Sequence, residues 1–140
     1  MKKKLLVLGA LGIVPFMTAC GGSTSKLTCS YKTGIGEINY IFEFDSSDKL
    51  TKAHLEQVVD YEKAECGTAD ECKEDAKKAL ENCKEEKDYT SCSLANESDK
   101  GVTIKATITD EALKKDDTIS TGTSKEDVKS QFEKAGYICK

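Results

Sequence analysis

The chain has 140 residues, with 21 Lys and Arg against 25 Asp and Glu and a formal net charge of −4 at pH 7. This acidic balance gives no electrostatic footprint for nucleic acid, so we expect no nucleic-acid partner. With five Tyr, four Phe and no Trp, the chain can fill only a thin core, and a small domain of this kind usually needs cross-links.

The N-terminus is typical of a signal peptide. Three lysines at positions 2–4 precede an apolar run over residues 5–17. A membrane-spanning helix needs roughly 20 apolar residues to cross a hydrocarbon core of ~30 Å, so this run is too short to be one. It fits the apolar region of an export signal instead.

The residues that follow the apolar run resemble the lipobox of bacterial lipoproteins. They are Met17, Thr18, Ala19 and Cys20, with Met17 standing where Leu is usual. In that family the cysteine carries a diacylglycerol lipid, and the signal peptide is cut just before it. The resemblance implies a signal peptide over residues 1–19, a lipid on Cys20 and a position on the extracytoplasmic face of the cell membrane. An ordinary secretory signal and a cytosolic protein are the alternatives.

The sequence predicts one domain after this signal. Residues 20–26 form a Gly/Ser/Thr linker, and residues 27–140 have the length of a single domain. Removal of the three N-terminal lysines changes the net charge to −7. Because such a chain is repelled by anionic lipid, the lipid on Cys20, and not the overall charge, must hold it at the membrane.

The first part of the domain predicts a β-meander. Residues 27–31 begin the ordered part, and residues 32–36 read as a hairpin turn with two glycines. Residues 37–45 alternate strictly, which predicts a strand whose apolar face carries Ile38, Tyr40, Phe42 and Phe44. Residues 50–59 fit a strand or a helix, and the turn at 45–48 favours a third antiparallel strand.

The middle of the chain predicts a helix and then a hairpin. Residues 68–87 form a helix in which Thr68 caps the N-terminus and Glu71 returns the hydrogen bond. A narrow apolar stripe and an otherwise charged surface predict that one side of this helix is solvated. Residues 90–95 and 101–109 then read as two strands joined by a polar turn.

The C-terminal part predicts a short helix over residues 110–117 and a capped helix over residues 124–135. Asp127 lies in the capping-box position of the second helix, and Gly136 ends it. Residues 137–140 form a short last strand. The fold class is therefore α+β: a mostly antiparallel sheet of five to six strands, with two helices packed on one face and disulfides reinforcing it.

The cysteines predict that reinforcement. With Cys20 lipidated, six remain, and an exported chain keeps disulfides. Cys72 and Cys83 lie 11 residues apart on one helix, roughly 16 Å, so they cannot bond each other. The preferred pairing is Cys29–Cys139, Cys66–Cys72 and Cys83–Cys92. Cys66–Cys83 with Cys72–Cys92 is the main alternative. The spacing lacks the close cysteine pairs of zinc sites and the C-x-x-C of redox centres.

The order of elements resembles the YehR-type family of small bacterial lipoproteins. The resemblance rests on residues 49–52 after a Phe-rich strand, on residues 101–104, and above all on Ser124 followed by residues 132–137. The additional cysteines depart from the family's usual pattern. The resemblance implies a lipobox, a β-meander, a helix, a hairpin and a C-terminal helix with a short strand. It implies no activity, so no functional residue other than Cys20 carries over.

The sequence contains no catalytic motif that leads to a reaction. His54 is the single histidine and reads as a surface or rim residue, because a catalytic base needs an orienting partner and a nucleophile. We expect no enzyme activity, no cofactor and no metal, and a monomer. A surface-displayed binding module of unknown ligand is the first hypothesis for function, and a structural, envelope-maintenance lipoprotein is the second.

Overall fold

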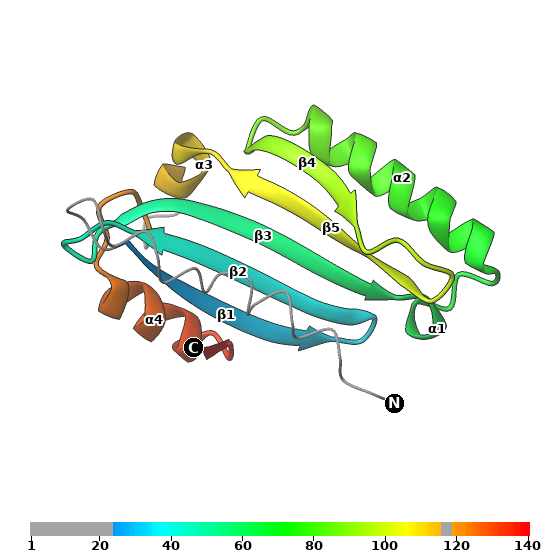
Figure 1. The fold of residues 1–140 in the computed structure, drawn as a ribbon, viewed down its shortest axis with the longest axis horizontal. Helices are drawn as coiled ribbons and strands as arrows, with labels where there is room; N and C mark the ends of the chain where they lie inside the picture. Colours follow the sequence, from blue (N-terminus) through cyan, green and yellow to red (C-terminus); the bar gives the residue numbers. More distant parts are fainter. Residues whose placement is uncertain (1–23, 116–118) are drawn as a thin grey trace.

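The computed structural model describes residues 24–115 and 119–140. Six strands form one antiparallel sheet in the order β4-β5-β3-β2-β1-β6 (Figure 1). The strands are β1 (Ser25–Thr33), β2 (Gly36–Phe44), β3 (Leu50–Asp60), β4 (Tyr89–Ala95), β5 (Gly101–Ile108) and β6 (Ile138–Cys139). The helices are α1 (Tyr61–Ala64), α2 (Ala69–Glu85), α3 (Asp110–Lys115) and α4 (Lys125–Lys134). The predicted α+β fold is confirmed.

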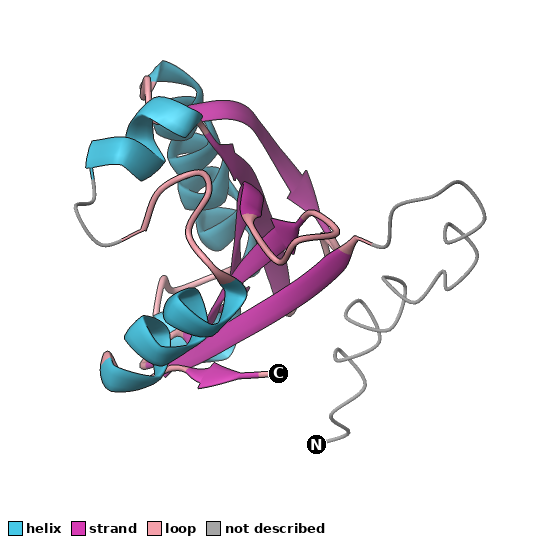
Figure 2. Ribbon diagram, turned by 90° about the vertical axis from the view of Figure 1, so that its left-hand side faces the viewer, coloured by secondary structure: helices cyan, strands magenta, loops and turns pink. Residues whose placement is uncertain are grey.

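The helices cover one face of the sheet, and no helix within residues 24–115 and 119–140 lies on the other face (Figure 2). Helix α2 lies along β4 and β5, and α4 lies along β1 and β6. The prediction that two helices pack on one face is thus confirmed. Because side chains alternate along a strand, each strand sends every second residue to the covered side.

Residues 50–60 form a central strand, which settles the ambiguity between strand and helix. β3 pairs with β2 on one side and with β5 on the other, so Ala53 lies between Phe42 and Ile108. The connection from β3 to β5 contains α1, α2 and β4, and β4 lies outside β5 at the edge of the sheet. Pairing on both sides satisfies the backbone donors and acceptors of this strand.

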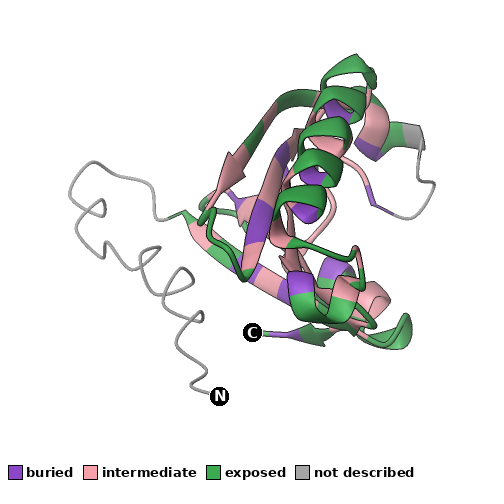
Figure 3. Ribbon diagram, turned by 90° about the vertical axis from the view of Figure 1, so that its right-hand side faces the viewer, coloured by how far each residue is buried: buried purple, intermediate pink, exposed green. Residues whose placement is uncertain are grey.

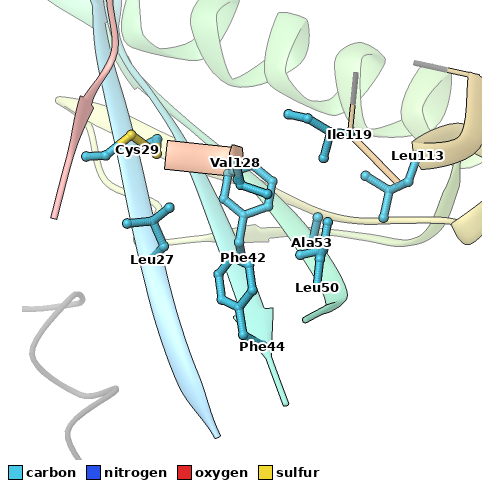
Figure 4. Packing of buried hydrophobic residues seen from close by; sticks show 10 residues of the cluster. Leu27, Cys29, Phe42, Phe44, Leu50, Ala53, Leu113, Ile119 and Val128 are labelled. Carbon is cyan, nitrogen blue, oxygen red and sulfur yellow. A yellow bond between two sulfur atoms is a disulfide. The ribbon is translucent and has the colours of Figure 1, made fainter. Parts of the chain in front are cut away.

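The core consists of two clusters beneath the helices. The first packs Phe42 and Phe44 of β2 against Val128 of α4, all three almost fully buried (Figure 4). Phe132 of α4 extends this cluster, with its ring centroid 4.9 Å from that of Phe42. The second cluster lies beneath α2 and contains Tyr61, Cys72, Ala76 and Val102. The outward side of α2 is exposed (Figure 3), as its charged sequence predicts.

Both predicted capping motifs are present. The Thr68 side chain accepts the Glu71 N–H, while the Glu71 carboxylate accepts the Thr68 N–H, so α2 has a complete capping box. Ser124 accepts the N–H of Asp127 at the start of α4. Gly136 adopts a φ of 94° after the end of α4, a conformation that glycine takes without steric cost.

Some element boundaries differ from the sequence prediction. β1 begins at Ser25, so the last two residues of the predicted linker belong to the sheet. Helix α1 was not predicted, because four residues carry no helical periodicity; Asp60 caps it by accepting the Glu62 N–H at 3.0 Å. The predicted helix over 110–117 is observed as far as Lys115, and its last two residues lie outside the described part of the chain.

Candidate functional site: the uncovered face of the sheet

The uncovered face is the side of the sheet opposite α2 and α4. Register places on it the even-numbered residues of β1, the even-numbered residues of β3 from Lys52 to Asp60, and the odd-numbered residues of β2 and β5, with Ser91 and Ser93 of β4. Leu50 at the start of β3 lies on the covered side, because the register shifts between Glu43 and Phe44. Most of these residues are Lys, Glu, Ser, Thr or Asn, whereas the covered side of the same strands is apolar. Antiparallel sheets commonly solvate one face in this way.

A row of polar contacts crosses this face with His54 at its centre. The imidazole Nδ1 of His54 on β3 lies 3.1 Å from the hydroxyl oxygen of Thr107 on β5. That oxygen accepts a hydrogen bond of 3.0 Å from the Ser91 hydroxyl on β4. On the other side of the ring, Nε2 lies 3.6 Å from Glu43 on β2, and Glu43 pairs with Lys26 of β1 at 3.2 Å. Five strands therefore contribute to one row.

The Ser91 hydroxyl determines which way the Thr107 hydroxyl can donate. Since Ser91 donates to Thr107, the Thr107 hydroxyl hydrogen is free to point at Nδ1 of His54. When Nδ1 accepts this hydrogen, Nε2 is the ring nitrogen that can donate toward the Glu43 carboxylate. The His54 and Glu43 side chains are 29% and 30% exposed, so a ligand on this face can reach both.

A second row runs parallel to the first. Lys105 of β5 pairs with Glu56 of β3 at 3.1 Å, and the Glu56 side chain is only 17% exposed. In the same register Ser30 of β1 donates to Asn39 of β2. These cross-strand pairs hold side chains in fixed positions and present donors and acceptors in alternation.

The order hydroxyl, imidazole and carboxylate resembles a nucleophile, its base and an orienting acid. In such a triad the carboxylate must hydrogen-bond the ring within about 3.2 Å. The distance between His54 and Glu43 is 3.6 Å, which is an ion-pair separation. The geometry therefore suits polar recognition better than activation of the Thr107 hydroxyl.

The six domain cysteines form the preferred pairs. Cys29 bonds Cys139 across β1 and β6, and the other two disulfides are Cys66–Cys72 and Cys83–Cys92. The last one joins α2 to β4, which is the edge strand of the sheet. Cys20, the predicted lipidation site, lies outside the described residues, as does the predicted signal peptide over 1–19.

Other titratable groups are scattered over the fold. Burial raises the pKa of Tyr61, Tyr89 and Tyr137 above the usual tyrosine value, and these residues lie in α1, in β4 and after α4. In the part of the chain that the structure describes, no three His, Cys, Asp or Glu side chains gather as metal ligands. An open depression on α4 is lined by Glu126, Lys129, Ser130, Glu133 and Lys134.

Sequence reasoning found His54 but missed its partners. His54 stands among alternating residues of β3, and this pattern gives its face but not its neighbours. Thr107 is 53 residues away and meets His54 only through the pairing of β3 with β5. No signal in the sequence links them, because register is a property of strand pairing.

Comparisons with family models, with curated proteins and with solved structures found no match to this chain. No helix in residues 24–115 or 119–140 is long and apolar enough to span a membrane.

Proposed function

We propose that this protein is an exported lipoprotein, held at the membrane by a lipid on Cys20, that presents the uncovered face of its sheet to a binding partner. The observation that carries the anchor is the use of cysteine. All six cysteines of the domain are paired, so Cys20 is the one left with a sequence suited to acylation. Disulfides persist outside the cytosol, which supports export.

The uncovered face supports a binding role. No helix of the described residues covers this face, so its partly exposed polar side chains are accessible to a ligand (Figure 2). Its side chains are held by the contacts of His54 with Thr107 and of Glu56 with Lys105. Such pre-positioned groups lose little conformational entropy when a ligand binds. The partner we propose is a polar molecule that bridges neighbouring strands.

The anchor is tested by producing the full chain in a bacterial host with radiolabelled palmitate. We expect label on the wild-type protein, recovery with membranes, and an intact mass showing a lipidated Cys20 with three disulfides. The matched variant is Cys20→Ser, which should lose the label. An unlabelled wild-type protein that keeps Met1 would refute the proposal.

The binding role is tested by photo-crosslinking in intact cells. A photoreactive residue at Thr28, on the uncovered face, should give a discrete adduct, whereas the same residue at Lys78, on the exposed side of α2, should not. Adducts of equal yield at both positions would contradict a role for this face.

The alternative proposal is a structural role in the envelope. The shallow depression on α4, with its charged lining, supports this alternative because small-molecule sites are usually enclosed and apolar. The structural role would be favoured if deletion of the protein weakens the envelope while substitutions at His54 and Glu56 have no effect.

A further inference from the structure

We propose that the lipid tether docks this domain on the membrane through one particular end of the sheet, where lysines meet the phosphate groups of the lipids. This inference rests on the proposed lipid anchor at Cys20. We call the docking end the proximal end and define it by Lys26, the turn at residues 45–49, Lys52 and Lys125.

The covalent distance from the lipid to the fold is short. β1 begins at Ser25, only five residues after Cys20. A fully extended chain spans at most about 3.6 Å per residue, so Ser25 lies within about 18 Å of the lipidated cysteine. That is less than the length of β3, whose 11 residues extend over roughly 35 Å. The tether therefore brings the end of the sheet that contains Ser25 to the membrane more easily than the opposite end.

The fold determines what lies beside Ser25. Its hydroxyl donates to Asp48 at 3.3 Å, and its register partner is Phe44 at the end of β2. The turn between β2 and β3 is thus adjacent to the start of β1, at the left of Figure 1. The N-terminus of α4 joins the same end, because Lys125 N–H donates to the Asp48 carbonyl at 3.0 Å.

Four lysines lie at this end among carboxylates. Lys49 and Lys52 are exposed, Lys26 has a side chain 53% exposed, and Lys125 lies near the ring of Phe44. The carboxylates beside them are Glu43, which pairs with Lys26, Asp45 and Asp48 in the turn, and Glu126 and Asp127 in the first turn of α4. Lysines near a membrane surface attract anionic lipid, while these carboxylates oppose that attraction. The short tether, and not net charge, therefore selects this end, and its lysines are the groups that can pair with lipid phosphates.

Docking at this end has a consequence for the uncovered face. The strands would point away from the membrane, so this face would look sideways into the aqueous space instead of lying against lipid. The turn between β1 and β2, helix α1 and the turn between β4 and β5 lie together at the opposite end (Figure 1). Among the lysines of that distal end are Lys32, Lys63 and Lys100.

The test is lysine footprinting of the lipidated full chain on vesicles of phosphatidylethanolamine and phosphatidylglycerol. Vesicles that carry the protein are first isolated by flotation, and the protein on them is treated with an amine-reactive reagent. Mass spectrometry then gives the rate of modification at each lysine. We expect Lys26, Lys49, Lys52 and Lys125 to react about fivefold more slowly than in the detergent-solubilised protein. The distal lysines serve as internal controls and should change less than about twofold.

Two variants separate the tether from the charge. Insertion of about 20 Gly and Ser residues after Gly22 keeps the lipid but removes the length limit, so proximal protection should fall toward the distal level. Lys49→Glu with Lys52→Glu should reduce the protection of Lys26 and Lys125 about twofold.

The outcomes are distinguishable from failure of the anchor itself. A protein that does not float with the vesicles would refute the lipid anchor of the proposed function. A protein that floats but shows uniform or distal protection would refute the docked orientation alone. Unchanged proximal protection after the Gly/Ser insertion would also overturn the tether argument.

Discussion

Cys29 on β1 and Cys139 on β6 are register partners, with their Cα atoms 4.0 Å apart and a disulfide between them. Cys29 is fully buried and Cys139 is nearly so. The bond joins the first strand to the last across a sequence separation of 110 residues. β6 has only two residues, so this disulfide adds a covalent bond to the few backbone hydrogen bonds, such as those between Thr28 and Lys140, that hold the C-terminus at the sheet edge.

The disulfides are expected to differ in their contribution to stability. In the chain-entropy model, the Cys29–Cys139 loop contributes about 5 kcal/mol and the six-residue Cys66–Cys72 loop about 2 kcal/mol. We therefore expect the double variant Cys29→Ala/Cys139→Ala to lose about 3 kcal/mol more unfolding free energy than Cys66→Ala/Cys72→Ala. Urea unfolding of both proteins measures the difference. Equal losses of unfolding free energy would show that the longer loop does not restrict the unfolded chain more than the shorter one.

Substitutions at two adjacent residues of β2 should destabilise the fold to very different extents. Phe42 lies beneath α4 and is 1% exposed, so Phe42→Ala should cost roughly 3–5 kcal/mol by loss of burial and creation of a cavity. Ile41 points to the uncovered face opposite His54, and Ile41→Thr should cost less than about 1 kcal/mol. Thermal unfolding of both variants measures the two losses of stability. A large loss at Ile41 would mean that the uncovered face is packed.

The pair formed by Lys73 and Asp99 should stabilise the fold over a defined pH range. The hydrogen bond from Lys73 lowers the pKa of Asp99, and the same bond raises the pKa of Lys73. A lowered carboxylate pKa gives stability that is present above the unfolded value, about pH 4, and lost as pH falls. A raised lysine pKa gives stability that is present below about pH 10.4 and lost at higher pH.

We therefore expect Asp99→Asn to lower the unfolding free energy slightly between these limits, and this effect should shrink progressively as the pH falls below about 4. The effect should also shrink in high salt, because both groups face solvent. Asp75→Asn, whose pair with Lys78 lies within α2, is the control for a purely local ion pair. Urea unfolding across pH measures both variants. A loss that stays the same as the pH falls would point to a cause other than this ion pair.

Local patterns in the sequence were sufficient for the type of most elements. The alternation that contains Phe42 and Phe44 gave β2 and its buried face, because the side-chain period of a strand is two whatever its neighbours are. Thr68 with Glu71 gave the start of α2, since a capping box is complete within four residues. Helix α1 was too short to produce any such pattern.

Relations between distant residues depended on the tertiary structure. Six cysteines allow 15 pairings, and helix geometry excluded only the bond between Cys72 and Cys83. The preferred pair Cys29–Cys139 comes together through the pairing of β1 with β6. The row through His54 and Thr107 has the same origin, because a one-residue slip of β3 against β5 would move His54 away from its partner. The sequence by itself therefore determined the buried face of the elements with a clear pattern, such as β2 and α2, through short-range periodicity. The tertiary structure decided which polar residues meet on the uncovered face, because strand order and register arise from contacts between segments far apart in the chain.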